Sequence, residues 1–364
     1  MTDLSAARTR VSAWLFDHAL PLWAQRGVDA DGRFWEALDF DGRPATGVKR
    51  RTRVQARQIY VFCEAAALGW DAGRPVARAG LDGLIAACRR EDGLWVSATD
   101  DAGAVVDETP DLYDMAFVLF ALAAAHRVLG DPRARPLALE TLAAIERLMG
   151  APHGGWQEAL PARLPRRQNP HMHLLEAMLA WQATAPDPVF ERTALECLRL
   201  CRTHFLVDGA IREYFTEAWA LDAETGHFVE PGHMEEWVWL LTQAETAGLG
   251  SAEAAEGLHR RAVTQGMRNG FLIREMDPAG TPLDAGWRLW AQTEGVRTAL
   301  LFDEAEAEAA ALLDRVFAVH LATETPGLWI DSYDADGRAV DRTVPASSLY
   351  HLMTAFTALL GRAA

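Results

Sequence analysis

The sequence has few basic residues and no long apolar run. Its 364 residues include 35 Lys and Arg against 51 Asp and Glu, which gives a net charge of −16. Proteins that bind nucleic acid need clustered cations for the phosphates, so this balance argues against a nucleic-acid partner. No stretch approaches the ~20 apolar residues of a membrane span, and the N-terminal MTDLSAARTR lacks the apolar core of a signal peptide. We therefore expect a soluble, cytoplasmic protein without a membrane partner.

Cysteine is also scarce, and its pattern does not indicate a metal site. All four cysteines, Cys63, Cys88, Cys197 and Cys201, fall in apolar stretches with helical spacing. Cys197 and Cys201 are four residues apart, but neither a second pair nor a histidine follows at zinc spacing. We predict buried free thiols, which suit a reducing compartment.

The few basic residues that are present form two clusters. Each cluster precedes a stretch with helical spacing, so we interpret both as local contacts to anions or hydroxyl groups, or as plain surface. The clusters are Lys49, Arg50 and Arg51 with Arg53 and Arg57, and Arg163 with Arg166 and Arg167.

Six short segments repeat along the chain, from DGRFWEALDFDG at Asp31 to GLWIDSYDADG at Gly327. Each begins at a glycine and alternates apolar with polar residues, which is typical of a small β-hairpin or an extended loop. Subtraction of residue numbers spaces the leading glycines 61, 62, 54, 61 and 57 residues apart. They are Gly32, Gly93, Gly155, Gly209, Gly270 and Gly327.

Two stretches with helical spacing lie between successive hairpins, which predicts twelve helices in six pairs. A periodic array of this kind is either an open solenoid with polar caps or a closed ring. The first and last helices are as apolar as the others, so we predict one (α/α)6 barrel over residues 1–364, with the hairpins at one mouth. The expected helices are 4–26, 47–70, 74–90, 111–129, 136–149, 169–184, 188–205, 232–246, 252–268, 286–301, 304–321 and 346–362.

The helix that follows each hairpin carries the unusual side chains, whereas its partner helix is rich in Ala, Leu, Glu and Arg. If these six helices form the inner ring, their polar and aromatic residues converge at one mouth and suit a polyhydroxylated ligand. The groups are Arg53 and Arg57; Asp111, Tyr113 and Asp114; Asn169, His171, His173 and Glu176; His233, Glu235 and Glu236; Trp287, Trp290, Gln292 and Glu294; and Ser347, Ser348, Tyr350 and His351.

Several of these residues also have a purely structural interpretation. His171 and His173 point about 200° apart on a regular helix, so they do not share a metal ion, and we predict none. Trp287 is expected in the core, and Asp114 is expected to satisfy helix ends or arginines. Arg57 is the strongest anomaly, because a guanidinium in an apolar helix must be paired or meet a ligand.

His233 and Glu236 lie in EPGHMEEWVW, where Pro and Gly precede an apolar helix. Residues three apart share a helix face, and an imidazole beside a carboxylate can move a proton near neutral pH. This segment and four others together resemble the N-acylglucosamine 2-epimerase superfamily over nearly the whole chain. The other four segments are ARQIYVF around Arg57, NPHMHLLEA around His173, LWAQTEG around Trp290 and SSLYHL around His351.

The resemblance implies an (α/α)6 barrel and proton transfer between C1 and C2 of a sugar, without a metal or other cofactor. By the same resemblance, His233 and His351 are general acid/base residues and Glu236 assists ring opening or orients a histidine. The implied substrate-binding residues are Arg57, Tyr113, Asn169, His173, Trp290, Gln292 and Glu294.

The segment SSLYH after Val344 is most similar to the mannose isomerase branch of the superfamily, and the hairpins are too short to build subsites for a disaccharide. We therefore favour conversion of D-mannose to D-fructose, with D-lyxose and D-xylulose as a related pair, by a monomer or homodimer. A phosphosugar stays open, because Arg166 and Arg167 could supply cations at the mouth.

Three alternatives stay open at this point. A 2-epimerase acting on N-acylglucosamine, mannose or cellobiose would use the same two histidines. An (α/α)6 glycoside hydrolase or lyase would use carboxylates such as Asp111, Glu236 or Glu294. A catalytically silent toroid that binds a partner would use none of them.

Overall fold

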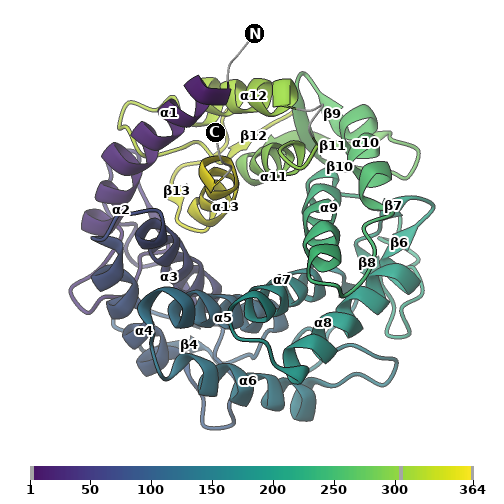
Figure 1. Ribbon diagram of the computed structural model, residues 1–364, viewed down its shortest axis with the longest axis horizontal. Helices are drawn as coiled ribbons and strands as arrows, with labels where there is room; N and C mark the ends of the chain where they lie inside the picture. The colour runs from purple at the N-terminus through teal and green to yellow at the C-terminus, as the bar shows by residue number, and fades with distance from the viewer. Residues whose placement is uncertain (1–3, 303–305, 362–364) are drawn as a thin grey trace.

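Two concentric rings of helices make up the protein (Figure 1). The computed structural model describes residues 4–302 and 306–361. Within these residues the chain is 54% helical and forms twelve helices with few strands. The predicted all-α (α/α)6 barrel is therefore confirmed.

The helices alternate between the two rings along the chain. The inner ring consists of α3 (Thr52–Ala67), α5 (Leu112–Ala124) with its extension η2 (Ala125–Leu129), α7 (Asn169–Thr184), α9 (Pro231–Thr246), α11 (Leu289–Ala299) and α13 (Ser348–Gly361). The outer ring consists of α1 (Leu4–Ala13), η1 (Trp14–Ala19) and α2 (Leu20–Arg26) in one rod, α4 (Gly73–Cys88), α6 (Ala134–Met149), α8 (Pro188–Leu200) with η3 (Cys201–Phe205), α10 (Ala255–Gly266), and α12 (Glu306–Arg315) with η5 (Val316–His320).

The two kinds of helix differ in how they are buried. Every residue of α5 except Tyr113 is buried, because inner helices contact neighbours on all sides. The buried residues of α8 instead follow the spacing Phe190, Thr193, Ala194, Cys197, which is one stripe of an amphipathic helix. All four cysteines are free and buried, as predicted.

The segment Leu112–Leu129 corrects one sequence expectation, because it has the length and apolarity of a membrane span. Of this window 72% is buried, and α5 packs against α3, α6 and α7. Packing within the barrel therefore accounts for its apolar composition.

The ring closes between the last helix and the first inner helix. Helix α13 packs against α3 on one side and α11 on the other. Strand β1 (Ala37–Leu38) also pairs antiparallel with β13 (Val344–Pro345), which joins the first hairpin region to the last. A closed ring rather than an open solenoid is the observed arrangement.

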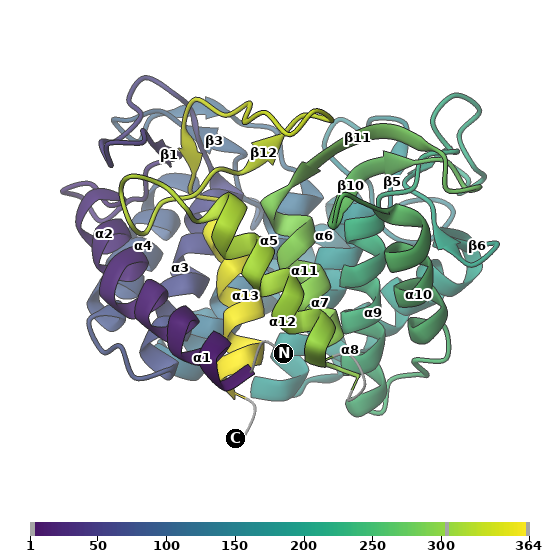
Figure 2. The same ribbon diagram turned by 90° about the horizontal axis from the view of Figure 1, so that it is seen from above.

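Short strands gather at one mouth of the barrel, near the N-terminal ends of the inner helices (Figure 2). The six leading glycines all have positive φ, between 64° and 93°, a conformation that favours glycine and permits the tight turns. The remaining strands are β2 (Arg50–Arg51), β3 (Ala98–Thr99), β4 (Val105–Asp107), β5 (Arg166–Arg167), β6 (Leu206–Val207), β7 (Ala210–Ile211), β8 (Tyr214–Phe215), β9 (Met267–Arg268), β10 (Phe271–Met276), β11 (Pro282–Arg288) and β12 (Ser332–Tyr333).

The fifth hairpin is longer than the sequence pattern predicted. Strand β11 continues to Arg288 and pairs with β10 and β12, so α11 begins at Leu289 and not at residue 286. Trp287 consequently lies on a strand, where its indole stacks between Phe271 and Tyr333 at 4.7 and 5.3 Å. Its predicted core role is confirmed, and its predicted place on a helix is wrong.

Candidate functional site

A cavity of about 190 Å³ lies where the inner helices begin. Nine of its lining residues fall in the first turn of an inner helix or directly before it, which is why short sequence motifs at helix starts converge here. The lining residues are Arg57, Tyr113, Asn169, His173, Glu230, His233, Glu236, Arg288, Trp290, Ser347, Ser348 and His351.

Carboxylates surround His233. Its Nδ1–H donates to Glu213 Oε2 at 3.0 Å and lies 3.6 Å from Glu230 Oε2. Burial lowers the pKa of His233, but Glu213, Glu230 and Glu236 outweigh burial and raise it well above its usual value. We therefore expect a protonated imidazole at neutral pH.

Two hydrogen bonds orient Glu213 toward His233. Trp237 donates its indole N–H to the Gln168 carbonyl oxygen at 2.7 Å. This contact assigns the oxygen and the nitrogen of the Gln168 side-chain amide. The Gln168 NH2 group therefore donates to Glu213 Oε2 at 3.0 Å. The buried relay from Trp237 thus holds the carboxylate against the histidine.

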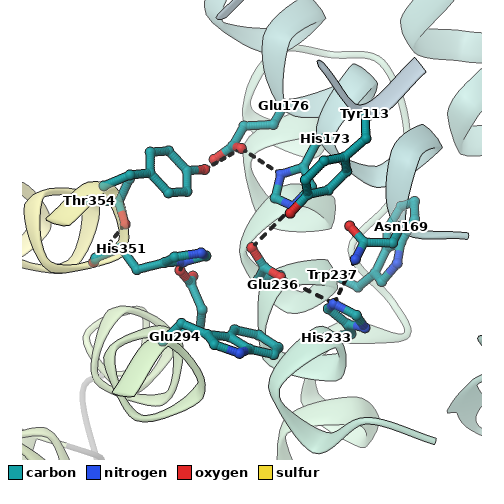
Figure 3. Close-up of polar contacts among 12 residues, drawn as sticks. Tyr113, Asn169, His173, Glu176, His233, Glu236, Trp237, Glu294, His351 and Thr354 are labelled. Atoms are coloured by element: carbon teal, nitrogen blue, oxygen red, sulfur yellow. Dashed lines mark hydrogen bonds and ion pairs between the residues drawn. The ribbon is translucent and has the colours of Figure 1, made fainter. Parts of the chain in front are cut away.

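Asn169 faces the other nitrogen of His233, with its Nδ2 at 3.2 Å from Nε2 (Figure 3). Its Oδ1 is buried without a hydrogen-bond partner. The amide donates to a neutral ring in this orientation, and after a flip its oxygen would accept from a protonated ring. Asn169 can therefore serve both protonation states of His233.

His351 has the opposite electrostatic environment. Its Nδ1–H donates to Glu294 Oε1 at 2.7 Å, which leaves Nε2 for the cavity (Figure 3). Burial lowers the pKa of His351 well below its usual value, and the nearby charges of Arg57 and His173 lower it further. This imidazole is neutral at physiological pH, so it can accept a proton.

Beneath the cavity, Arg297 binds two buried carboxylates. Its Nη1 lies 3.3 Å from Glu294 Oε2 and 3.6 Å from Glu176 Oε1. Glu176 also accepts from Tyr350 and from the Nδ1–H of His173 at 3.1 Å. Burial would raise the pKa of Glu176, but His173, Arg297 and Tyr350 hold it at about 2. Arg297 thus links the carboxylates that orient His351 and His173.

Glu236 projects into the cavity between His173 and His233. Its oxygens lie 3.9 Å from His173 Nε2 and 4.0 Å from His233 Nε2 (Figure 3). Burial raises its pKa well above the usual value, and Glu294 raises it further, against the charge of His233. Glu236 is therefore poised to carry a proton into neutral pH, as a buried carboxylic acid can.

Arg57 contacts no carboxylate within 4.0 Å among the residues that the structure describes. Its Nη2 donates to Tyr113 Oη at 2.8 Å, and its guanidinium lies 4.0 Å from the centre of the Phe117 ring. The residue is only 6% exposed and lines the cavity. Arg57 is therefore a nearly buried cation that can bind a ligand in the cavity.

The indole of Trp290 lies between the two catalytic candidates. Its ring centre is 5.1 Å from that of His233 and 5.6 Å from that of His351. An aromatic face at this position can cover the apolar side of a sugar.

The cavity brings together eight of the ten predicted site residues. The exceptions are Gln292 and Glu294, which do not line it. The Gln292 amide bonds the backbone N–H and C=O of Leu272, at 2.8 and 2.9 Å, and is occupied in holding a strand. Its predicted contact with substrate therefore does not agree with the structure, and Glu294 lies behind His351 instead of beside the ligand.

Four residues of the site were missed: Glu213, Glu230, Arg288 and Arg297. Glu230 stands three residues before His233, the same spacing as His233 and Glu236, so the sequence did contain a signal for it. Arg297 stands three residues after Glu294, a spacing that is typical of an ion pair on the exposed face of a helix. Glu213 and Arg288 come from strand regions, and no local spacing connects them with the cavity.

Two groups of the described residues also have the composition of a metal site. They are Glu213, Glu230 and His233, and Glu236, Glu294 and His351, each with ligand atoms within 4.8 Å of one another. In both groups the Nδ1 proton of a histidine already lies between the nitrogen and a carboxylate. A cation bound through Nδ1 would have to displace that proton.

Comparison with known proteins identifies the family. The sequence profile of N-acylglucosamine 2-epimerase (GlcNAc 2-epimerase) matches residues 32–355. The mannose-6-phosphate isomerase of Rhizobium meliloti (strain 1021) is 35% identical, over 97% of this chain and 96% of that protein. The D-mannose isomerase of Thermobifida fusca is 30% identical, over 83% and 80%. The solved structure of cellobiose 2-epimerase from Spirochaeta thermophila DSM 6192 superimposes with a TM-score of 0.85 at 24% identity, over 98% of this chain and 96% of that one.

The chain belongs to the N-acylglucosamine 2-epimerase family. It is an enzyme, a sugar isomerase or epimerase. The resemblance noted in the sequence is confirmed, and the glycoside hydrolase and the catalytically silent toroid are set aside.

Proposed function

We propose that the enzyme interconverts an aldose of D-mannose configuration and the ketose of D-fructose configuration. The observation that carries this proposal is the pair of histidines with opposite pKa shifts around one small cavity, His351 lowered and His233 raised. At neutral pH this pair supplies one base and one acid together, which is what a proton transfer along a carbon chain requires.

The reaction begins with a closed sugar ring. Ring opening needs a proton added at the ring oxygen and one removed from the anomeric hydroxyl. Glu236 lines the cavity and carries a proton, so one of its oxygens can donate to the ring oxygen while the other accepts the proton of the anomeric hydroxyl. The protonated His233, its neighbour on one helix turn, keeps its proton for the later step. We assign ring opening to Glu236, with His233 beside it.

Neutral His351 then removes the proton from C2 of the open aldose. The electrons form a cis-enediolate, whose negative oxygen is stabilised by the unpaired guanidinium of Arg57 with Tyr113 beside it. Return of the proton from His351 to C1, with His233 transferring a proton between O1 and O2, gives the ketose. All these steps are acid–base chemistry of the protein side chains.

The size of the cavity supports a single sugar. At about 190 Å³ it is well below the roughly 300–1,000 Å³ of clefts that enclose drug-sized ligands. The names of both relatives quoted above also refer to mannose. D-Lyxose and D-xylulose have the same configuration at the reacting carbons and are the secondary substrate pair.

The second candidate is a 2-epimerase. The presence of His233 beside Trp290 supports it, because an acid that reprotonates the opposite face of C2 would give the epimer. Incubation of D-mannose with the enzyme in D2O, followed by NMR, distinguishes the two reactions. Fructose as first product, with deuterium at C1, is expected; glucose without fructose would replace isomerisation by epimerisation.

A further inference from the structure

A second, larger cavity of about 740 Å³ lies outside the reaction cavity at the hairpin mouth. The two cavities share five lining residues, so they are continuous: Arg57, Tyr113, Asn169, Arg288 and Ser347. We call the outer one the vestibule.

The vestibule is basic in a strongly acidic protein. Seven cations line it but only three carboxylates, Asp107, Asp111 and Glu158, although the whole chain carries −16. Three further carboxylates, Glu36, Asp114 and Asp331, pair with lining arginines from behind. Besides Arg57 the cations are Lys49, Arg51, Arg53, Arg163, Arg167 and Arg288. The two basic clusters of the sequence therefore meet at one place.

The geometry of two short strands determines which arginines line the vestibule. Strands β2 and β5 are each an Arg-Arg pair before an inner helix, and successive strand residues point to opposite faces. Arg51 and Arg167 line the vestibule, whereas Arg50 and Arg166 are buried behind it. Arg166 packs on the Trp219 ring at 3.4 Å, so the expectation that it supplies charge at the mouth is wrong.

Three of the vestibule arginines keep hydrogen-bonding capacity for a ligand. Arg53 bonds Asp114 through Nη1, Arg167 bonds Glu158 through Nε, and Arg288 bonds Asp331 through Nε and Nη2. Each therefore has at least one guanidinium nitrogen outside these carboxylate contacts. Their side chains are 24%, 35% and 44% exposed, which leaves them accessible to a solute.

We propose that the vestibule binds the phosphate of a phosphorylated aldose, at the end distant from C1 and C2. Arg53, Arg167 and Arg288 would donate to the phosphate oxygens, with Lys49 adding charge. The inference rests on the proposed reaction and names its substrate class as a hexose 6-phosphate. A phosphate monoester suits planar guanidinium groups, which bind its oxygens with two parallel hydrogen bonds.

A neutral second sugar unit fits the lining less well. Sugar units of an oligosaccharide rest on aromatic faces, and the vestibule offers only Tyr113 and Tyr214 among its lining residues. The dominant feature is instead the group of partly exposed arginines with free guanidinium nitrogens, which suit an anion better than a neutral sugar.

The test compares D-mannose 6-phosphate with D-mannose as substrates for the full-length enzyme. The main variant is Arg167→Gln, because Arg167 lines the vestibule and not the reaction cavity. Its kcat/KM for the phosphate ester should fall roughly 10- to 100-fold, as expected for one lost charge-assisted hydrogen bond, while kcat/KM for D-mannose changes less than threefold. Arg167→Lys should recover part of the loss.

Arg89→Gln is the matched control, since Arg89 is 39% exposed and bonds Glu140 on the outer ring. Arg89→Gln should leave kcat/KM unchanged for both substrates. Inorganic phosphate should compete with D-mannose 6-phosphate more strongly than chloride of equal ionic strength does.

The outcomes separate the two proposals. If neither sugar is isomerised or epimerised, the proposed reaction fails. If D-mannose is turned over but its 6-phosphate is no better a substrate, or if Arg167→Gln lowers kcat/KM equally for both sugars, the phosphate subsite is overturned while the reaction stands. A better rate with a mannose disaccharide than with the phosphate ester would overturn it as well.

Discussion

His233 and His351 contact the same side chain, the indole of Trp290, yet their pKa values shift in opposite directions. Three carboxylates act on the first imidazole, whereas Arg57 and His173 act on the second. The fold thus places the proposed acid and the proposed base on helices α9 and α13, with α11 between them. The predictions below follow from this asymmetry.

Replacement of the base should remove the chemistry. We expect His351→Ala to lower kcat with D-mannose by at least ~100-fold, the scale of lost acid–base catalysis. Exchange of the C2 hydrogen with D2O, followed by NMR, should be lost to the same extent. His204→Ala is the control, since His204 packs on Trp219, away from the cavity lining. If His351→Ala exchanged the C2 hydrogen at the wild-type rate, another residue would have to be the base.

The pH profile of kcat/KM should have a broad maximum that includes pH 6.5, the ordinary pKa of histidine. His351 must be neutral and its pKa is lowered, so the acidic limb should lie well below pH 6.5. His233 must be protonated and its pKa is raised, so the alkaline limb should lie well above pH 6.5. His233→Asn should lower the rate and change the position of the alkaline limb, because an amide does not titrate and loss of the Glu236 proton alone then sets that limb. A single limb at pH 6.5 would contradict the assignment.

Removal of the unpaired cation should affect the transition state more than substrate binding. We expect Arg57→Gln to lower kcat by roughly 10²–10³, as for loss of one oxyanion donor, with a smaller change in KM. The kcat of Arg57→Lys should lie between that of Arg57→Gln and that of the wild type, because lysine keeps the charge but not the guanidinium geometry of the hydrogen bond to Tyr113. Arg78→Gln on the outer helix α4 serves as control. A pure KM effect would assign Arg57 to ground-state binding only.

Glu176 should contribute to stability in a pH-dependent way. Its pKa of about 2 is below the ordinary value of 4.5 for a glutamate, so its contribution to stability is present above pH 4.5 and is lost as pH falls toward 2. We expect Glu176→Gln to lower the free energy of unfolding by about 2–4 kcal/mol at pH 7, and by less at pH 3. Urea unfolding at both pH values measures this. The exposed pair partner Glu256 provides a control, Glu256→Gln, with a change of about 0.5 kcal/mol or less.

Metal chelation should leave turnover unchanged. The proposed steps are proton transfers among side chains and need no ion, and in both clusters with metal-like composition the histidine Nδ1 bonds a carboxylate. Activity after EDTA treatment and gel filtration, compared with activity after added Mn²⁺, Co²⁺ or Zn²⁺, is the measurement. Loss on chelation and recovery with one ion would require a metal at one of these clusters.

The sequence predicted the ring because the features that build it are local. Glycines at 54- to 62-residue intervals mark turns that need positive φ, and helical spacing marks the elements between them. The site motifs could be recognised for the same reason, since His233, Trp290 and His351 all stand within three residues of a helix start.

What the sequence did not show depends on contacts between elements distant in the chain. Arg297 and Glu294 form an ordinary helical pair by spacing, and only the approach of Glu176 from α7 makes them a buried network. Glu213 meets His233 because two hairpin regions adjoin. Trp287 was assigned to a helix because pairing of β11 with β10 and β12, which decides its conformation, leaves no local pattern.

The closing helix α13 has a consequence for biosynthesis. It carries His351, and the backbone of Ser347 just before it contacts Arg57 at 3.5 Å. A chain still being translated lacks both the proposed base and one wall of the cavity until this segment leaves the ribosome. The proposed reaction therefore becomes possible only when the ring is complete.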